Sequence, residues 1–349
     1  MAMMEAELVG RRKWLQPEHF ARAYALVKVL PGAAALQMSI YLGQVRRGRL
    51  GGLVAGLSFI LPAFILVLGI SIAYERFQSV PRAERLFSGM QVAALVVILD
   101  SVLRMARPYR SEKRSIVIAI ISCIAIVFRP SIEPLVILGF GILGAFSFHR
   151  PSKTGTRVVS TLALFQAGGI FNWNALVQSP IFKLTFVCLK AGALVFGTGL
   201  AIIPMLENDV VGKYHWLTHG QFLDGLAIGQ VTPGPVVITS TFIGYKVAGL
   251  LGAVLATVAI ILPGFINILI IIPPFERRIS NSPRLKDFTH WAIPAVIGGI
   301  LGSTTRLGFL VVRSVPLGIL FVVTSVIVLK WRPPVWIVIP LAGITYFLL

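Results

Sequence analysis

Long stretches of apolar residues, separated by short polar loops, follow one another along the whole chain. About 20 apolar residues in a helix span the hydrocarbon core of a bilayer. Several stretches reach that length and others fall a little short, so the pattern predicts an all-α, polytopic membrane protein with about 10–12 transmembrane helices or half-helices. The nearly uncharged stretches are residues 50–74, 86–103, 113–128, 132–148, 181–206, 247–275, 314–329 and 333–349.

The composition supports a membrane protein. Of the 349 residues, 56% are hydrophobic and 13% are charged, whereas a soluble domain carries about a quarter charged residues. No cleavable signal peptide is visible, because the N-terminal residues contain no apolar core segment. Cys123 and Cys188 lie in apolar stretches without metal-binding or redox spacing, and both are interpreted as packing residues.

The net charge of +19 first suggests nucleic acid as a partner. The basic residues instead cluster in short loops between apolar stretches, where the positive-inside rule places them, and no aromatic residues interleave with them as a stacking platform requires. We therefore expect no nucleic-acid partner, a lipid bilayer as surroundings and a multi-pass location in the cell inner or plasma membrane. The clusters lie at residues 46–49, 104–114, 150–157 and 277–286.

The two halves of the chain resemble each other, which predicts an internal duplication. We place the N-terminal repeat at residues 1–157 and the C-terminal repeat at residues 158–349. The matched pairs, about 202 positions apart, are Trp14 and Trp216, Pro31 and Pro233, Gly32 and Gly234, Pro62 and Pro263, Glu75 and Glu276, and Arg104 and Arg306.

Equivalent loops of the two repeats differ in charge. The loop at residues 46–49 is strongly basic, whereas its counterpart contains Lys246 alone. Placing the basic loops in the cytoplasm puts these equivalent loops on opposite faces of the membrane, so we predict an inverted repeat, as in many secondary transporters. The apolar stretch from Lys190 to Pro204, before the second repeat, has no counterpart before the first. We therefore expect the first repeat to lack its opening helix, through a late start, a truncation or genuine absence.

Two apolar segments are interrupted at matching places, Leu30-Pro31-Gly32 and Thr232-Pro233-Gly234-Pro235. Proline removes a backbone donor and clashes with the preceding turn. Such breaks persist in a membrane only where they are buried in protein or line a cavity. A helix that restarts after the break directs unpaired N–H groups and a positive dipole end toward it, which favours an anion. We therefore predict that both breaks form the substrate site.

Polar side chains near the breaks are further candidates for substrate contact. In the second repeat these are Gln230, Thr232 and Thr239, and in the first repeat Gln37. Lys28 lies four residues before Gly32, and an ionisable group within a membrane segment is a functional candidate, although snorkelling to the interface is an equal alternative.

A small-residue motif follows Lys190. The segment Lys190, Phe196, Gly197 and Gly199 either contacts substrate or serves close helix packing. Asp224 and Glu207 are candidates for proton coupling, with a solvated helix end as the alternative. No catalytic or metal-binding motif is present, so we expect neither an enzyme nor a cofactor or metal.

The second-repeat motif, from Lys190 through Glu207, Trp216 and Asp224 to Pro235, resembles the signature of the chromate ion transporter superfamily. The first half repeats this motif more loosely, and the resemblance covers nearly the whole chain. It implies the two-domain form of that family, whose halves are antiparallel. Three positions depart from the family pattern: Lys28 replaces a glutamine, Ala33 a proline and Thr198 a glycine, and the opening helix with Phe-Gly-Gly-Pro is absent.

The resemblance implies a secondary transporter that exports chromate by alternating access across the inner membrane. Uptake or exchange of sulfate on the same scaffold is one alternative, because sulfate is a tetrahedral dianion of nearly the same shape. A truncated, non-transporting membrane scaffold is another. The sequence leaves the oligomeric state open, with a homodimer as one alternative.

Overall fold

The structure is a computed structural model, and it describes residues 4, 7, 11, 14, 16–77, 81–147, 179–195, 199–274 and 282–349. The described part forms helices and no β-strand, which confirms the all-α prediction. The boundary that we placed between residues 157 and 158 lies outside the described residues.

The helices of the first half recur in the same order in the second half, where further helices precede them. In the first half they are α2 (Pro17–Val29), α3 (Ala34–Phe77), α4 (Pro81–Ala106), α5 (Lys113–Phe128) and α6 (Glu133–Ser147), with 3-10 turns η2 (Arg107–Tyr109) and η3 (Pro130–Ile132). In the second half they are α8 (Pro180–Leu194), η5 (Gly199–Ala201), α9 (Ile202–Glu207), η6 (Asn208–Lys213), α10 (His219–Val231), η7 (Val236–Ile238), α11 (Thr239–Ile266), η8 (Asn267–Ile271), α13 (Pro283–Val311), α14 (Val315–Trp331) and α15 (Val335–Leu348).

The predicted duplication is visible in where helices begin. α2, α4, α5 and α6 each start 202 positions before α10, α13, α14 and α15, respectively. Local sequence explains several of these starts. Proline at the first helical position opens α2, α4 and α13, Ser282 caps α13 through the Leu285 amide, and Thr218 and Gln221 form a capping box at α10.

α3 and α11 are each a tight hairpin rather than one straight helix. Ser39 Oγ donates to the Ala55 carbonyl at 3.1 Å, although 16 residues of straight helix would separate these residues by about 24 Å. Thr241 and Thr257 hydroxyls meet at 2.6 Å in the same way. The reversals are at Gly48, with φ of 65°, and at Gly249, with φ of 60°, a region of backbone space open to glycine.

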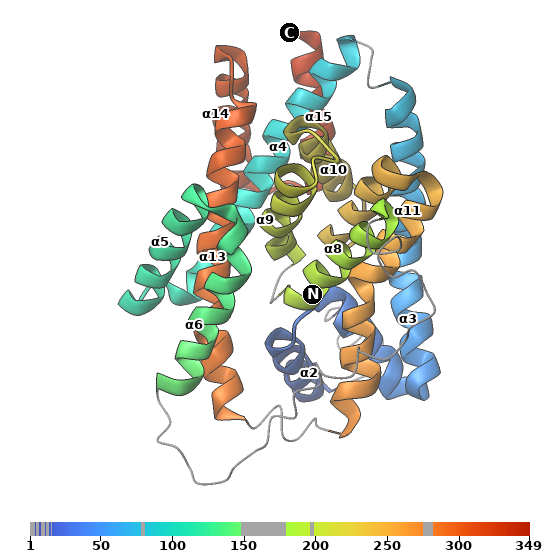
Figure 1. The fold of residues 1–349 in the computed structure, drawn as a ribbon, viewed down its shortest axis with the longest axis vertical. Helices are drawn as coiled ribbons and strands as arrows, with labels where there is room; N and C mark the ends of the chain where they lie inside the picture. Colours follow the sequence, from blue (N-terminus) through green and yellow to red (C-terminus); the bar gives the residue numbers. More distant parts are fainter. Residues whose placement is uncertain are drawn as a thin grey trace.

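Glycine also lets the two arms of each hairpin touch. A Cβ added at Gly43 would lie 2.3 Å from the Gly51 carbonyl oxygen, and one added at Gly244 would lie 2.2 Å from the Gly252 oxygen. In Figure 1 the reversal of α3 lies at the lower end of the molecule, whereas that of α11 lies nearer the top. Equivalent hairpins therefore point in opposite directions.

Side-chain contacts confirm that equivalent helices run antiparallel. Along the long arm of α3, Gly52 faces Leu269, Gly56 faces Phe265, and Glu75 pairs with Lys246, so partner numbers fall as α3 numbers rise. The outer helices are exchanged between halves: α4 packs on α14 and α15, and α13 packs on α5 and α6. Such reciprocal exchange is what a two-fold relation produces. The predicted inverted repeat is therefore observed.

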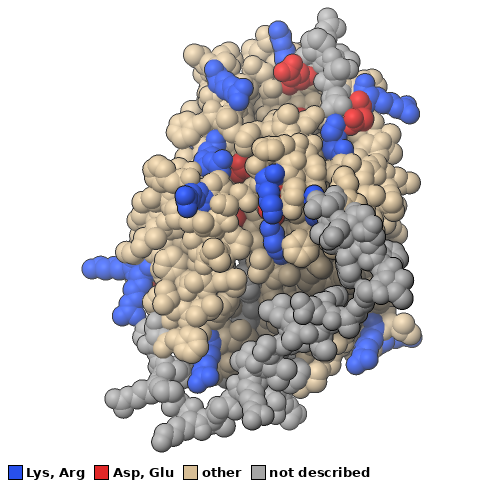
Figure 2. Space-filling model, viewed as in Figure 1, with Lys and Arg blue, Asp and Glu red and all other residues tan. Residues whose placement is uncertain are grey.

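Four described helical segments are long and apolar enough to span a membrane: Ala34–Phe77, Ala83–Tyr109, Val236–Pro274 and Pro283–Val311. Shorter apolar helices flank them, at Pro130–Phe146, Val315–Trp331 and Val335–Leu348. Large apolar side chains cover the outside, such as Leu50 at 77% exposed and Phe309 at 80%. Figure 2 shows a surface that is mostly uncharged, with visible charges mainly basic. An apolar exterior of this kind faces lipid, so the protein is a multi-pass membrane protein.

Candidate functional site

The first Pro-Gly break separates α2 from α3 and has its backbone groups satisfied by other elements. Gly32, with φ of 133°, donates its N–H to the Val195 carbonyl at 2.5 Å. The Pro31 carbonyl accepts the side-chain amides of Gln37 and Asn267, each at 2.6 Å. Burial of a broken helix in a membrane requires this kind of substitute hydrogen bonding, and it holds the break in one conformation.

The second break separates α10 from α11 and lies against α3. A Cβ added at Gly234 would lie 2.6 Å from the Ala63 Cβ. Thr232 Oγ1 donates to the Gly229 carbonyl, and Thr239 Oγ1 to the Val236 carbonyl, each at 2.9 Å. These two hydroxyls therefore stabilise the local backbone, the alternative use of such groups in membrane helices.

Each break thus packs against the proline-containing part of the other repeat's long arm. Ala63 follows Pro62 in α3, and Gly264 follows Pro263 in α11, where it lies close to Gln37. The contacts are exchanged between the repeats, as the two-fold relation requires. The two breaks are consequently brought to the interface between the repeats.

A cavity of about 760 Å³ lies between the two breaks, and we call it the central cavity. The first break contributes the start of the first arm of α3, and the second break contributes the end of α10 and the entry to η7. The remaining wall comes from α2, α4, η2, η5, α13 and α15. The lining includes Ala33, Ala34, Ala35, Ser101, Arg104, Tyr109, Gly199, Gln230, Gly234, Pro235 and Val236.

Gln230 and Arg104 are two of the side chains that give the central cavity hydrogen-bond donors. Gln230 is half-buried, and neither its amide nitrogen nor its amide oxygen has a partner among the described residues. Arg104 is ion-paired with the buried Asp100 on the same helix. A guanidinium group carries five N–H donors, more than one carboxylate uses. The cavity therefore offers donors whose hydrogen bonds are not all made.

Helix starts add backbone donors to the same wall. The first four N–H groups of a helix have no partner within that helix. Ala34 opens the first arm of α3, and Val236 opens η7, and both line the central cavity. The positive ends of these helices therefore lie at the cavity, an arrangement that favours a negatively charged occupant.

The structure brings several predicted residues together and leaves others elsewhere. Gly199, Gln230, Gly234 and Pro235 line the central cavity, whereas Pro31, Gly32, Gln37, Thr232, Pro233 and Thr239 belong to the breaks without being part of its lining. Lys190 is ion-paired with Asp209 and lines a different hollow. Phe196, Gly197 and the Lys28 side chain lie outside the described residues.

The two proton-coupling candidates lie in separate polar clusters. Asp224 is buried in α10 and accepts hydrogen bonds from Tyr74 Oη at 2.7 Å and Gln91 Nε2 at 2.8 Å. Glu207 is buried in α9, where Ser303 Oγ donates to it at 3.3 Å. Arg306 lies 3.9 Å from Glu207. Neither carboxylate lines the central cavity.

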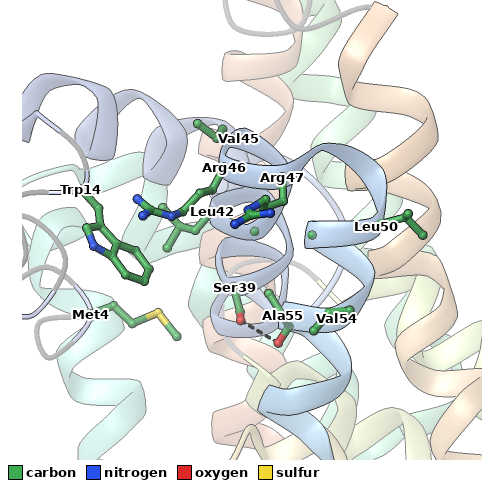
Figure 3. A pocket seen from close by; sticks show the side chains of 12 residues that line it. Met4, Trp14, Ser39, Leu42, Val45, Arg46, Arg47, Leu50, Val54 and Ala55 are labelled. Carbon is green, nitrogen blue, oxygen red and sulfur yellow. Dashed lines mark hydrogen bonds between the residues drawn. The ribbon is translucent and has the colours of Figure 1, made fainter.

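A second hollow, of about 830 Å³, lies beside the α3 reversal and contains neither break. Figure 3 shows Arg46 extending toward the Trp14 ring, whose centroid lies 4.2 Å from the guanidinium carbon, and Arg47 near the turn. Arginine and tryptophan side chains at a hairpin tip are typical of the membrane interface. This hollow is therefore set apart from the central cavity.

Sequence reasoning missed Arg104 as a cavity residue and used it, with its repeat partner Arg306, only as a matched pair of the duplication, interpreted as structural or interfacial. The available signal was an arginine four residues after Asp100 at the end of a long apolar stretch. Charged residues within membrane segments face cavities or partners in the protein interior. The structure places Arg104 at the cavity while Arg306 lies near Glu207.

Antiparallel repeats, broken helices that meet at a cavity, and an apolar exterior are typical of membrane transporters. The sequence model of the family described as chromate transporter matches residues 1–145 and 182–347. The chain belongs to the chromate transporter family, a family of transporters rather than enzymes.

Curated relatives cover most of the chain. The chromate transport protein of Pseudomonas aeruginosa is 34% identical over 314 residues, covering 87% of this chain and 74% of that protein. That of Cupriavidus metallidurans is 32% identical over 336 residues, covering 94% and 82%. A probable chromate transport protein of Synechococcus elongatus is 32% identical over 353 residues, covering 99% and 89%. No solved structure matches the chain.

Proposed function

We propose that this protein is a secondary transporter that exports chromate across the inner membrane by alternating access, with the central cavity as its anion site. The observation that carries the proposal is the position of Gln230. Its amide has no hydrogen-bond partner in the part of the chain that the structure describes, and it lies in a cavity bounded by both helix breaks. A polar group left without a partner in a partly buried site is costly unless a ligand or water satisfies it.

The cavity chemistry fits a doubly charged oxyanion. The Gln230 amide, the Arg104 guanidinium and the N–H groups at the starts of α3 and η7 could replace the hydration of such an ion. Pro31, Gly32, Thr232 and Pro233 would hold the breaks in place around it. Lys28 is proposed as an additional charge from α2, and Phe196 and Gly197 as contacts contributed before Gly199.

The proposed mechanism uses the antiparallel repeats. Two copies related by a two-fold axis in the membrane plane can adopt two conformations in which their roles are exchanged, one open to each side. Gly234 of the second break contacts Ala63 of α3, and Gln37, beside the first break, contacts Gly264 of α11. Rocking of one repeat against the other would loosen one of these contacts while keeping the other.

The proposed direction follows from electrical energy. A dianion leaving a cell with a negative interior gains roughly 2.3 kcal/mol per charge for each 100 mV of membrane potential. Coupling to protons is proposed through Asp224 or Glu207, the buried carboxylates of α10 and α9. The same donors would accept sulfate, so sulfate is the competing substrate.

Vesicle transport tests the substrate and the direction together. Everted membrane vesicles containing the protein are expected to accumulate chromate faster than control vesicles, and right-side-out vesicles are not. Accumulation of sulfate but not chromate would show that sulfate is the substrate. Accumulation by right-side-out vesicles alone would show that transport is inward. Absence of both ions from both kinds of vesicle would contradict the proposed function.

A Gln230→Met variant tests the site. Loss of one hydrogen bond to a charged group costs about 1.5–3 kcal/mol, so we expect the KM for chromate to rise roughly ten-fold or more. Gln44→Met is the matched control, since Gln44 lies in the α3 hairpin away from the central cavity. An unchanged KM in Gln230→Met would remove Gln230 from the site.

A further inference from the structure

A small hollow of about 230 Å³ lies where η3 and the start of α6 meet α8 and η6, and we call it the carboxyl hollow. Glu133, Lys190, Asn208, Asp209 and Lys213 are among its lining residues. It shares no lining residue with the central cavity. The role proposed for the central cavity therefore does not account for it.

Glu133 is the unusual member of this hollow. Its side chain is 0% exposed, and neither carboxyl oxygen has a hydrogen-bond partner among the described residues. It packs over Gly299 of α13, where an added Cβ would lie 3.2 Å from Glu133 Oε1. An ionised carboxylate buried without a partner costs several kcal/mol. The side chain must therefore be neutralised by a bound proton or cation.

Packing does not require a carboxyl group at this position. The repeat counterpart of Glu133 is Val335, which opens α15 just as Glu133 opens α6. Val335 lines the central cavity and fills the corresponding place with an apolar side chain. The acid is thus a specific feature of one repeat, at a site where valine suffices for the fold in the other.

The charged neighbours favour a proton over a metal cation. The Lys190–Asp209 ion pair lies on α8 and η6, and Lys213 lines the same hollow. On the other side, Glu207 of α9 is close to Arg306 of α13. The two lysine ammonium groups repel a metal ion, whereas a proton needs only one carboxyl oxygen.

A short segment connects this hollow to the central cavity. Gly199 and Leu200 in η5 line the central cavity, and Met205 and Asp209, at the end of α9 and in η6, line the carboxyl hollow. Movement of η5 and α9 would change both places at once. This physical link gives a route by which occupation of one site alters the other.

We propose that Glu133 is a proton-binding group that couples proton movement to anion transport. The proposal rests on the proposed transport function and adds Glu133 to Asp224 and Glu207 as a carboxyl group that coupling requires. Protonated Glu133 is neutral and stable in the hollow. Loss of the proton leaves a charge that the Lys190 ammonium must compensate, which pulls on α8, η6 and the connected α9.

Glu133→Gln in proteoliposomes tests the proposal, because glutamine imitates the protonated acid in shape and cannot release a proton. We expect the variant to retain chromate exchange at equal pH on both sides and to lose accumulation driven by a pH gradient. Glu84→Gln, at an exposed position of α4, is the matched control and should keep both activities. Gradient-driven accumulation that survives Glu133→Gln, or that follows sodium instead of protons, would overturn the proposal.

A measurement independent of transport separates this proposal from the proposed function. Infrared spectra of the purified protein at neutral pH are expected to contain the carbonyl band of a protonated carboxylic acid. The difference between the wild-type and Glu133→Gln spectra should contain this band, because the variant lacks it. An identical band in wild type and variant would exclude a proton on Glu133. If wild-type protein carries neither exchange nor accumulation, the transport function fails while the infrared result still decides the protonation of Glu133.

Discussion

Gly234→Ala adds one methyl group where the second break meets the long arm of α3. The new Cβ would lie 2.6 Å from the Ala63 Cβ, whereas carbon atoms in contact are about 3.5–4.0 Å apart. Gly234 is not among the glycines at positive φ, so alanine meets no backbone strain there. The break and α3 must separate by about 1 Å, and overpacking of this kind costs about 1–3 kcal/mol.

Ala63→Gly removes the opposing methyl group and supplies the second half of a double-mutant cycle. Alone it should cost up to about 1 kcal/mol, because glycine is unfavourable within a helix. Combined with Gly234→Ala it restores the space, so the double variant should lose no more than about 1 kcal/mol. Gly69→Ala is the control, since no atom of the described residues lies within 4 Å of an added Cβ at Gly69.

Equilibrium unfolding in mixed micelles measures the stabilities, and initial rates of chromate uptake into everted vesicles measure function. We expect Gly234→Ala to lose both stability and transport, and the double variant to recover both. Stabilities that simply add, with no recovery in the double variant, would refute the contact between the second break and α3. Recovered stability without recovered transport would show that Gly234 contributes to ion binding in addition to packing.

Two further predictions concern hydrogen bonds inside the membrane region. Tyr74→Phe removes the 2.7 Å hydrogen bond to the buried Asp224; a bond to a charged group is worth about 1.5–3 kcal/mol, so unfolding in micelles should shift by that amount. If Asp224 couples protons, the pH profile of transport should move as well, and an unmoved profile counts against that role. Thr257→Val removes the hydroxyl that meets Thr241 across the α11 hairpin and should cost about 1 kcal/mol; full stability in this variant would contradict the tight reversal at Gly249.

The inverted repeat could be predicted because it leaves its mark at single positions. Trp14, Pro31 and Gly32 recur in order in the second half, and the basic loop at residues 46–49 has a nearly uncharged counterpart. Proline and glycine mark a backbone break, and lysine and arginine mark the side of the membrane on which a loop lies. Both depend on the residue type at a single position, so they can be recognised in the sequence.

The sequence indicated where α3 and α11 reverse, through the basic loop at residues 46–49 and its counterpart with Lys246. It did not indicate how tightly the two arms of each hairpin pack. Only Gly48 and Gly249 adopt the left-handed backbone there, and glycine is common elsewhere in the chain. The reversal is stabilised by arm-to-arm contacts such as Ser39 with Ala55. Contacts between residues 16 positions apart depend on the completed turn and are not visible in the pattern of the residues that precede it.

The sequence by itself determined that this protein is helical, lies in a membrane, is duplicated and is broken twice at equivalent prolines, because hydropathy and backbone chemistry act residue by residue. Only the tertiary structure decided which side chains those breaks face. It placed Gln230 and Arg104 together at one cavity, turned Gln37 toward the Pro31 carbonyl, and left Glu133 buried with no hydrogen-bond partner in the described part of the chain. Those outcomes depend on how helices of one repeat pack against helices of the other, and such packing joins segments that are far apart in the sequence.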